Sequence, residues 1–200
     1  MKKLLVIVAL AALASLTAVA DTIQLVNTSG NVQGGVATTP YYLSVNGGSD
    51  IAAVCVDFDQ HVTIGESWSG SVINMAGDLS NTRLGAAGFA IYREEAWLYS
   101  QFLSGAGTSG DINFAIWGLT SANARNNAGF TASAQHWLDL ATTTDLANFS
   151  TVNFNIISPR DLSATGPQEY VVATPEPASL FLLGSGLLGL GGLARKKMKA

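Results

Sequence analysis

Hydrophobic and polar positions alternate along several short stretches in the first third of the chain, and this period of two predicts β-strands. Glycine-rich connectors, SGNVQGG and NGGSD, separate the stretches and are typical of turns. The stretch from Ile51 to Phe58 is the strongest, because alternation places Val54 and Val56 on one face and Cys55 on the other. The predicted strands are residues 22–27, 41–45, 51–58 and 66–75.

The pattern then changes to helical spacing, and strand-like stretches return near residue 151. Residues 86–103 place Phe89, Tyr92, Ala96, Tyr99 and Leu103 on one helical face. Asp111 is the predicted N-cap of a second helix and Thr131 that of a third. Residues 151–157 and 168–172 are predicted strands. We therefore expect an α+β domain in which strands, as a sandwich or an open barrel, flank a helical insert.

The N-terminus has the pattern of a secretory signal peptide over residues 1–20. Lys2 and Lys3 precede an apolar stretch, and Ala18-Val19-Ala20 supplies the small residues of a cleavage site. A retained anchor is the alternative, but the apolar stretch is short for a membrane span. We expect export through the Sec translocon and cleavage by signal peptidase after Ala20, which leaves Asp21 as the first mature residue.

The C-terminus predicts one transmembrane helix. Pro175 and Pro177 end the regular structure of the body, and the seventeen residues 178–194 carry no charge. As a helix they would span about 26 Å, slightly less than a hydrocarbon core. A basic cluster follows and should stay in the cytoplasm, with the body outside. Its members are Arg195, Lys196, Lys197 and Lys199.

The order of these parts resembles the PEP-CTERM sorting signal. Pro175-Glu176-Pro177 is followed directly by the apolar segment and then by the basic chain end. The resemblance implies a Gram-negative protein that pauses in the inner membrane and is cut by exosortase near the Pro-Glu-Pro step. It is then released to the cell surface or the extracellular space, often in bacteria that make exopolysaccharide and biofilm. The alternative is a lasting membrane anchor. The predicted segments are 1–20, 21–173 and 174–200.

The body of the chain is acidic and has a single cysteine. Between residues 21 and 173, four arginines stand against thirteen acidic residues, and lysine is confined to the two ends. Such a body repels phosphate backbones, so we expect no nucleic-acid partner. With Cys55 as the sole cysteine no intramolecular disulfide can form, and the core must be stable without one.

Cys55 and the later segment INFAIW resemble, in part, the thioester domains of bacterial surface adhesins. Ala115, Ile116 and Trp117 match the family's motif. The position of the reactive glutamine, however, is Asn113, whose side chain is one methylene shorter. The resemblance implies a bond between Cys55 and Asn113, and the shorter side chain argues against it. A buried, unreactive thiol is the simpler interpretation.

The remaining residues suggest no catalytic group. His61 and His136 are isolated, and Glu94 and Glu95 are adjacent and point to different sides of a helix. Asp57, Asp59 and Glu66 could bind calcium, although no EF-hand spacing is present. We therefore expect a non-enzymatic exported protein without cofactor or metal, which could associate with polysaccharide. An adhesin with a thioester or a tryptophan-lined glycan site is the alternative, and a secreted hydrolase ranks lowest.

Overall fold

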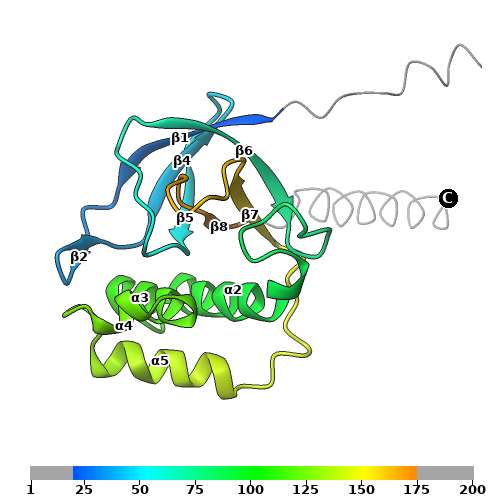
Figure 1. The fold of residues 1–200 in the computed structure, drawn as a ribbon. Helices are drawn as coiled ribbons and strands as arrows, with labels where there is room; N and C mark the ends of the chain where they lie inside the picture. Colours follow the sequence, from blue (N-terminus) through cyan, green and yellow to red (C-terminus); the bar gives the residue numbers. More distant parts are fainter. Residues whose placement is uncertain (1–19, 175–200) are drawn as a thin grey trace, which may run out of the picture.

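The structure is a computed structural model that describes residues 20–174. Six antiparallel strands close into a barrel in the order β1-β4-β5-β8-β7-β6. A layer of helices packs against one side of it (Figure 1). The barrel strands are β1 (Asp21–Thr28), β4 (Tyr41–Val45), β5 (Ile51–Cys55), β6 (Ser67–Asn74), β7 (Phe154–Pro159) and β8 (Tyr170–Ala173).

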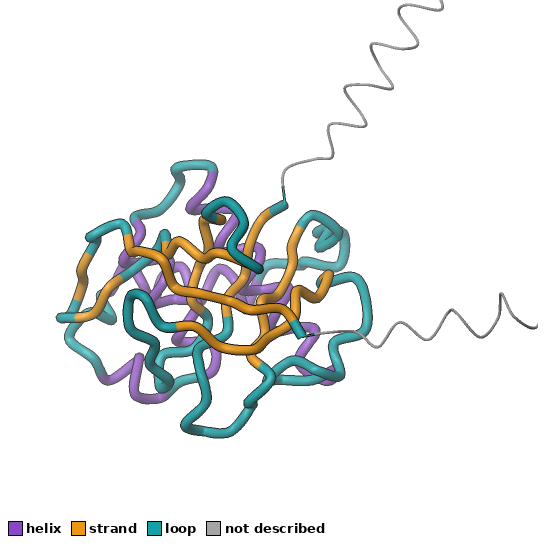
Figure 2. Tube along the Cα trace, turned by 90° about the horizontal axis from the view of Figure 1, so that it is seen from above, coloured by secondary structure: helices purple, strands orange, loops and turns teal. Residues whose placement is uncertain are grey.

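The helices of residues 20–174 lie between β6 and β7 in the chain, which agrees with the predicted helical insert. They are the short 3-10 helix η1 (Ala86–Gly88), α2 (Phe89–Leu103), α3 (Ser109–Thr120), α4 (Ala122–Asn126) and α5 (Ala132–Thr143). A small hairpin of β2 (Val32–Gln33) and β3 (Val36–Ala37) interrupts the chain between β1 and β4. Seen from above, the strands lie across the helical layer (Figure 2).

The α+β class and the helical insert are confirmed, but the prediction of a sandwich or an open barrel is wrong. The barrel closes because β1 pairs with β6 through Ile23 and Trp68 as well as with β4 through Ile23 and Val45. Gly70 permits part of this closure, since a Cβ there would lie 2.7 Å from the carbonyl oxygen of Ser158. Pairings between strands this far apart in the chain leave no trace in local periodicity.

Turn chemistry agrees with the sequence between β4 and β5. Asn46 and Gly47 have φ angles of 53° and 70°, and the amide of Gly48 donates to the carbonyl oxygen of Val45 at 2.9 Å. Two central residues with positive φ form the hairpin turn for which Asn-Gly is the preferred sequence.

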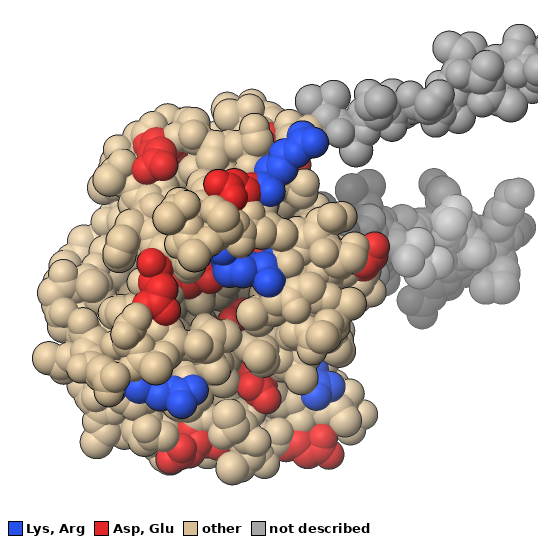
Figure 3. All heavy atoms as spheres, in the orientation of Figure 1, with Lys and Arg blue, Asp and Glu red and all other residues tan. Residues whose placement is uncertain are grey.

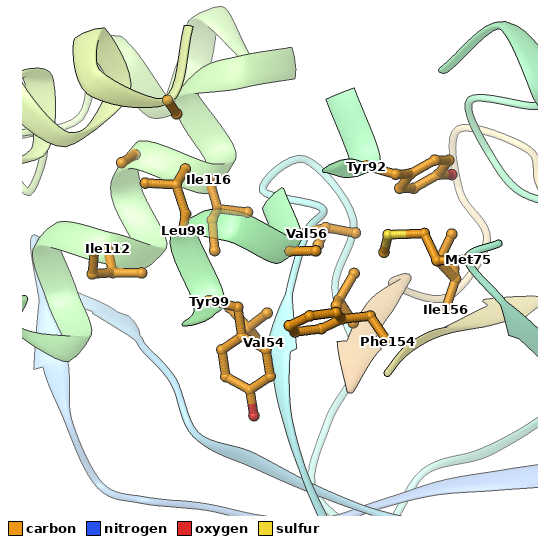
Figure 4. Close-up of a cluster of buried hydrophobic side chains, with 14 of the residues drawn as sticks. Val54, Val56, Met75, Tyr92, Leu98, Tyr99, Ile112, Ile116, Phe154 and Ile156 are labelled. Atoms are coloured by element: carbon orange, nitrogen blue, oxygen red, sulfur yellow. The ribbon is translucent and has the colours of Figure 1, made fainter. Parts of the chain in front are cut away.

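Alternation on the central strands builds a core on each side of the barrel wall. Val54 of β5, Val56 just after this strand and Ile156 of β7 face the helices, and Figure 4 shows them beside aromatic and aliphatic side chains of α2 and α3. Cys55 and Tyr170 point into the barrel and pack in a second cluster. These strands therefore have apolar residues on both faces, which explains the nearly continuous apolar sequence of β5 and β8.

Of the two predicted helix caps, one needs correction and one is confirmed. The second helix begins at Ser109 with Thr108 as its N-cap, whose hydroxyl accepts from the amide of Asp111. Asp111 is thus the third residue of the helix and not its cap. The prediction of Thr131 as the N-cap of the third helix is confirmed, since its hydroxyl accepts from the amide of Ala134 at 3.0 Å. The five-residue helix α4 was missed because it is too short to show a period.

No helix within residues 20–174 is long and apolar enough to cross a membrane. The predicted signal peptide, apart from Ala20, lies outside the described residues, as do the predicted membrane span and the basic cluster.

Candidate functional site

Three acidic side chains that are far apart in the sequence meet at one end of the barrel. Asp57 follows β5, Glu169 precedes β8, and Glu95 comes from α2. The pairing of β5 with β8 brings the first two together, because the amide of Val56 donates to the carbonyl oxygen of Glu169 at 3.0 Å. Packing of α2 against these strands adds Glu95. We call Asp57, Glu95 and Glu169 the carboxylate cluster.

Arg83 is the cation of this region, and it ties several segments together. Its Nε donates to Oδ2 of Asp57 at 2.8 Å in a largely buried ion pair. Its backbone amide donates to Oε1 of Glu169 at 3.0 Å. The other guanidinium nitrogens donate to the carbonyl oxygens of the loop that leads into β8, namely those of Leu162, Ser163 and Pro167.

The carboxylates of Asp57 and Glu169 both accept hydrogen bonds from neighbouring groups. Oδ2 of Asp57 also accepts from the amide of Glu169 at 2.7 Å, and Oε2 of Glu169 accepts from the hydroxyl of Tyr92 at 2.6 Å. Burial raises the pKa of Asp57 to about 6, although the charge of Arg83 opposes the rise. Burial, together with the neighbouring Glu169, also raises the pKa of Tyr92, so its hydroxyl remains a donor at neutral pH.

Glu95 is buried without a partner. Its side chain is 1% exposed, and its Oε2 has no hydrogen-bond partner within residues 20–174. Burial, followed by the charges of Glu169, Asp57 and Glu94, raises its pKa well above the ordinary value. A buried carboxyl without a donor is costly, and such groups in native proteins call for an explanation.

A cavity of about 160 Å³ opens beside the carboxylate cluster. Its polar lining includes all three acids of the cluster and Arg83, and its apolar lining comes from Val56, Phe58, Leu84 and the ring of Tyr92. The site therefore combines a small, partly open cavity, acidic side chains and one buried carboxyl group without a partner in the described residues.

The sequence did not predict this site. Asp57 was considered as a ligand for calcium together with Asp59 and Glu66, but these side chains have separate partners. Asp59 accepts from Asn123 at 2.7 Å, and Glu66 accepts from Thr63 at 3.1 Å. No group of three or more His, Cys, Asp or Glu in the described part of the chain is placed to hold a metal ion.

A signal for Glu95 was nevertheless present in the sequence. It lies three residues after Tyr92 and four before Tyr99, on the face that residues 86–103 present to the core. An acidic residue on an apolar helical face is rare unless it has a partner or a function.

The structure also brings Cys55 and Asn113 together. Nδ2 of Asn113 donates to the carbonyl oxygen of Cys55 at 2.9 Å, and both residues are fully buried. Oδ1 of Asn113 accepts from the amide of Thr39 at 2.8 Å. The thiol of Cys55 contacts the carbonyl oxygen of Asp57 at 3.1 Å. The carboxamide thus joins three parts of the chain: β5, α3 and Thr39, two residues before β4.

These contacts favour a structural role for the pair. Burial, with the negative charge of Asp57, raises the pKa of the Cys55 thiol, so little thiolate forms near neutral pH. Both ends of the Asn113 side chain are occupied by backbone groups. A bond between Cys55 and Asn113 remains a prediction that intact mass measurement can test.

The tryptophans pack into the core and do not form an open aromatic surface. Trp117 is 2% exposed and meets the ring of Phe114 edge-on at 5.1 Å. Trp97 and Trp137 are half-buried against the helical core, with ring centroids 6.4 Å apart. Charged side chains are sparse on the face drawn in Figure 3, and each basic group there has an acidic one nearby.

The last described residues define where the folded body ends. β8 ends at Ala173, and both the amide and the hydroxyl of Thr174 donate to the carbonyl oxygen of Asn153. Pro175, Glu176 and Pro177 follow immediately and lie outside the described residues. Residues 173–196 match the PEP-CTERM protein-sorting motif. The chain carries a PEP-CTERM sorting motif.

The PEP-CTERM motif implies an exported protein that exosortase processes and that is sorted to the cell surface. The predicted resemblance of the tail is thereby confirmed. No curated protein and no solved structure matches the chain.

Proposed function

We propose that this protein is a non-enzymatic component of the cell surface or extracellular matrix, where it associates with exopolysaccharide after exosortase removes its tail. The match of residues 173–196 to the sorting motif carries this proposal. The signal peptide pattern of residues 1–20 supports export, and the uncharged segment 178–194 supports a pause in the inner membrane before cleavage.

The fold is compatible with removal of the tail. All six barrel strands end before Pro175, and β8 lies between β5 and β7. Cleavage within or after the Pro-Glu-Pro step would therefore remove no strand from the barrel. The two prolines cannot donate backbone hydrogen bonds and disfavour regular structure, which suits a segment that a protease must bind in extended form.

Mass spectrometry of the mature C-terminus, with and without exosortase, tests the sorting step. We expect a C-terminus near Pro177 when the enzyme is present and a chain that ends at Ala200 when it is absent. Replacing Pro175, Glu176 and Pro177 by alanine should give the uncleaved form even with the enzyme. Ser179→Ala, just beyond the motif, is the matched control and should be processed normally. Normal processing of the triple variant would refute the proposal.

The contact between Cys55 and Asn113 keeps one alternative open, that of an adhesin with an internal thioester. Formation of the bond would release ammonia and protect the thiol from labelling. Intact mass of the unfolded mature protein therefore separates the two cases. We expect the full mass and one thiol that reacts after unfolding, because the Asn113 carboxamide is already bound to backbone groups.

A further inference from the structure

We propose that the cavity beside the carboxylate cluster binds the protonated amine of a ring-sized polar molecule, with an amino sugar as the ligand class. Glu95, which lines the cavity and whose buried Oε2 has no partner in the described residues, carries this inference. The site uses residues 56–169 only, so it does not depend on how the chain is sorted.

The hydrogen-bond donors of Arg83 and Tyr92, which line the same cavity, donate to acceptors other than Glu95. The guanidinium of Arg83 donates to Asp57 and to the carbonyl oxygens of the loop before β8. The hydroxyl of Tyr92 donates to Glu169. Glu95 therefore receives no donor from the cationic or phenolic group nearest to it. A primary ammonium has three N–H donors. It could donate a hydrogen bond to the carboxylate of Glu95 and a second one to that of Asp57.

Charge favours the same ligand. The acidic side chains that line the cavity are Asp57, Asp59, Glu95 and Glu169, and its single basic side chain is Arg83. A cation in this cavity would compensate the excess of negative charge, whereas a carboxylate or phosphate would meet repulsion. The acids are not arranged to hold a metal ion in the described residues, which favours a cation that binds through directed N–H groups.

The size of the cavity limits the ligand to about one ring. A cavity of about 150 Å³ accommodates a benzene molecule, and the cavity here measures about 160 Å³. Val56, Phe58 and Leu84 offer apolar contacts for the C–H faces of a sugar ring, while the acids lie where its polar groups would be. The terminal amino sugar of a polysaccharide fits this combination.

Binding should be coupled to loss of a proton from Glu95. The charged groups around Glu95 are Glu169 before β8, Asp57 after β5 and the adjacent Glu94 of its own helix, with Arg83 as the cation that lines the same cavity. Without ligand, burial and these acids favour the protonated form of Glu95. An ammonium favours the ionised form, so affinity should rise with pH as long as the amine itself stays protonated.

Calorimetric titration of the full-length protein with glucosamine, glucose and N-acetylglucosamine tests the site. We expect saturable binding of glucosamine at pH 7, at least about tenfold weaker binding of the two uncharged sugars, and weaker binding of glucosamine at pH 5. Glu95→Gln should weaken glucosamine binding about tenfold or more. Glu94→Gln, on the neighbouring and more exposed position, is the matched control and should change it less than about twofold.

Proton release gives a readout that needs no variant. Titration of the unmodified protein in buffers of different ionisation enthalpy should show protons leaving the protein as glucosamine binds. Equal affinity for glucosamine and glucose, absence of glucosamine binding, or binding without proton release would overturn the inference. Each of these results would leave the sorting proposal untouched, because C-terminal processing is measured separately.

Discussion

At the scale of single residues, Glu95 shows how the environment decides the state of a side chain. It lies on the same helix as Glu94, but Glu95 is 1% exposed whereas Glu94 is only partly buried. Burial, followed by the charges of Glu169, Asp57 and Glu94, stabilises its protonated form. The folded protein therefore holds the proton of this carboxyl to a higher pH than the unfolded chain does, which makes stability depend on pH.

Glu95→Gln should stabilise the protein in the absence of ligand, and the gain should grow with pH. The folded state holds the Glu95 proton to a higher pH than the unfolded chain, so the free energy of unfolding of the unmodified protein falls as pH rises between the two pKa values. The loss is about 1.4 kcal/mol for each pH unit in that range, and glutamine does not titrate. Thermal melts at pH 4, 6 and 8 measure the difference.

The outcome at low pH is the control for this prediction. Below the pKa of the unfolded chain both states are protonated, and the two proteins should unfold at similar temperatures. A stability difference that is the same at all three pH values would show that Glu95 is not held neutral by its surroundings.

Arg83 is the second residue whose removal should have a large effect. Arg83→Met leaves Asp57 buried without its cation and releases the loop of Leu162, Ser163 and Pro167. The backbone amide at position 83, which donates to Glu169, is retained. Breaking one side of a buried ion pair costs about 3–5 kcal/mol, so denaturant unfolding should show a loss of this size. Arg160→Met, at an exposed position whose hydrogen bond uses only the backbone amide, should change stability by less than about 0.5 kcal/mol.

At the scale of elements, the features that were predicted correctly are those that depend on interactions between residues close together in the sequence. The strand Tyr41–Val45 and the cap Thr131 were predicted correctly because alternation and capping act over a few residues. The N-cap of α3 was predicted at Asp111, three residues too late. Thr108 and Asp111 are both residue types that favour the N-cap position, and an N-cap side chain accepts from the backbone amide three residues later, which here is the amide of Asp111. Local pattern alone does not choose between them.

Thr108→Ala should therefore destabilise the domain by about 1 kcal/mol, because the amide of Asp111 loses its side-chain acceptor. The hydroxyl of Thr108 also donates to Oδ2 of Asp111 at 2.9 Å, and this bond is lost as well. Thermal unfolding measures the effect. Ser109→Ala removes a hydroxyl one residue later that forms no side-chain hydrogen bond in the described residues, and it should be close to neutral. A similar loss for both variants would contradict the assignment of the cap.

At the scale of the whole molecule, the barrel depends on pairings that sequence patterns do not contain. Its closure through β1 and β6, and the meeting of Asp57, Glu95 and Glu169, join residues that are tens of positions apart. The Cys55–Asn113 contact was suggested only through a partial family resemblance. The targeting segments, by contrast, are linear signals, and the tail could be identified from its order of motif, apolar segment and basic end.

The two predicted processing points coincide with the limits of the barrel. β1 begins at Asp21, directly after the predicted signal peptidase site, and Oδ1 of Asp21 accepts from Asn46 at 2.8 Å. At the other end, Thr174 is held by Asn153 immediately before the Pro-Glu-Pro step. The segment between the processing points therefore contains every strand of the barrel together with the helical insert.

A protein cut to residues 21–174 should consequently fold like the full mature chain. We expect the same circular dichroism spectrum, and a melting temperature within about 2 °C of that of a version ending at Pro177, because no described contact of the barrel is removed.

A version cut to residues 21–165 is the informative comparison. It lacks β8, which pairs with both β5 and β7, and it also removes Glu169 from the carboxylate cluster. This shorter chain should show no cooperative unfolding transition, since the barrel cannot close and two apolar strand edges are left open. Cooperative unfolding of residues 21–165 would mean that the barrel does not hold the domain together.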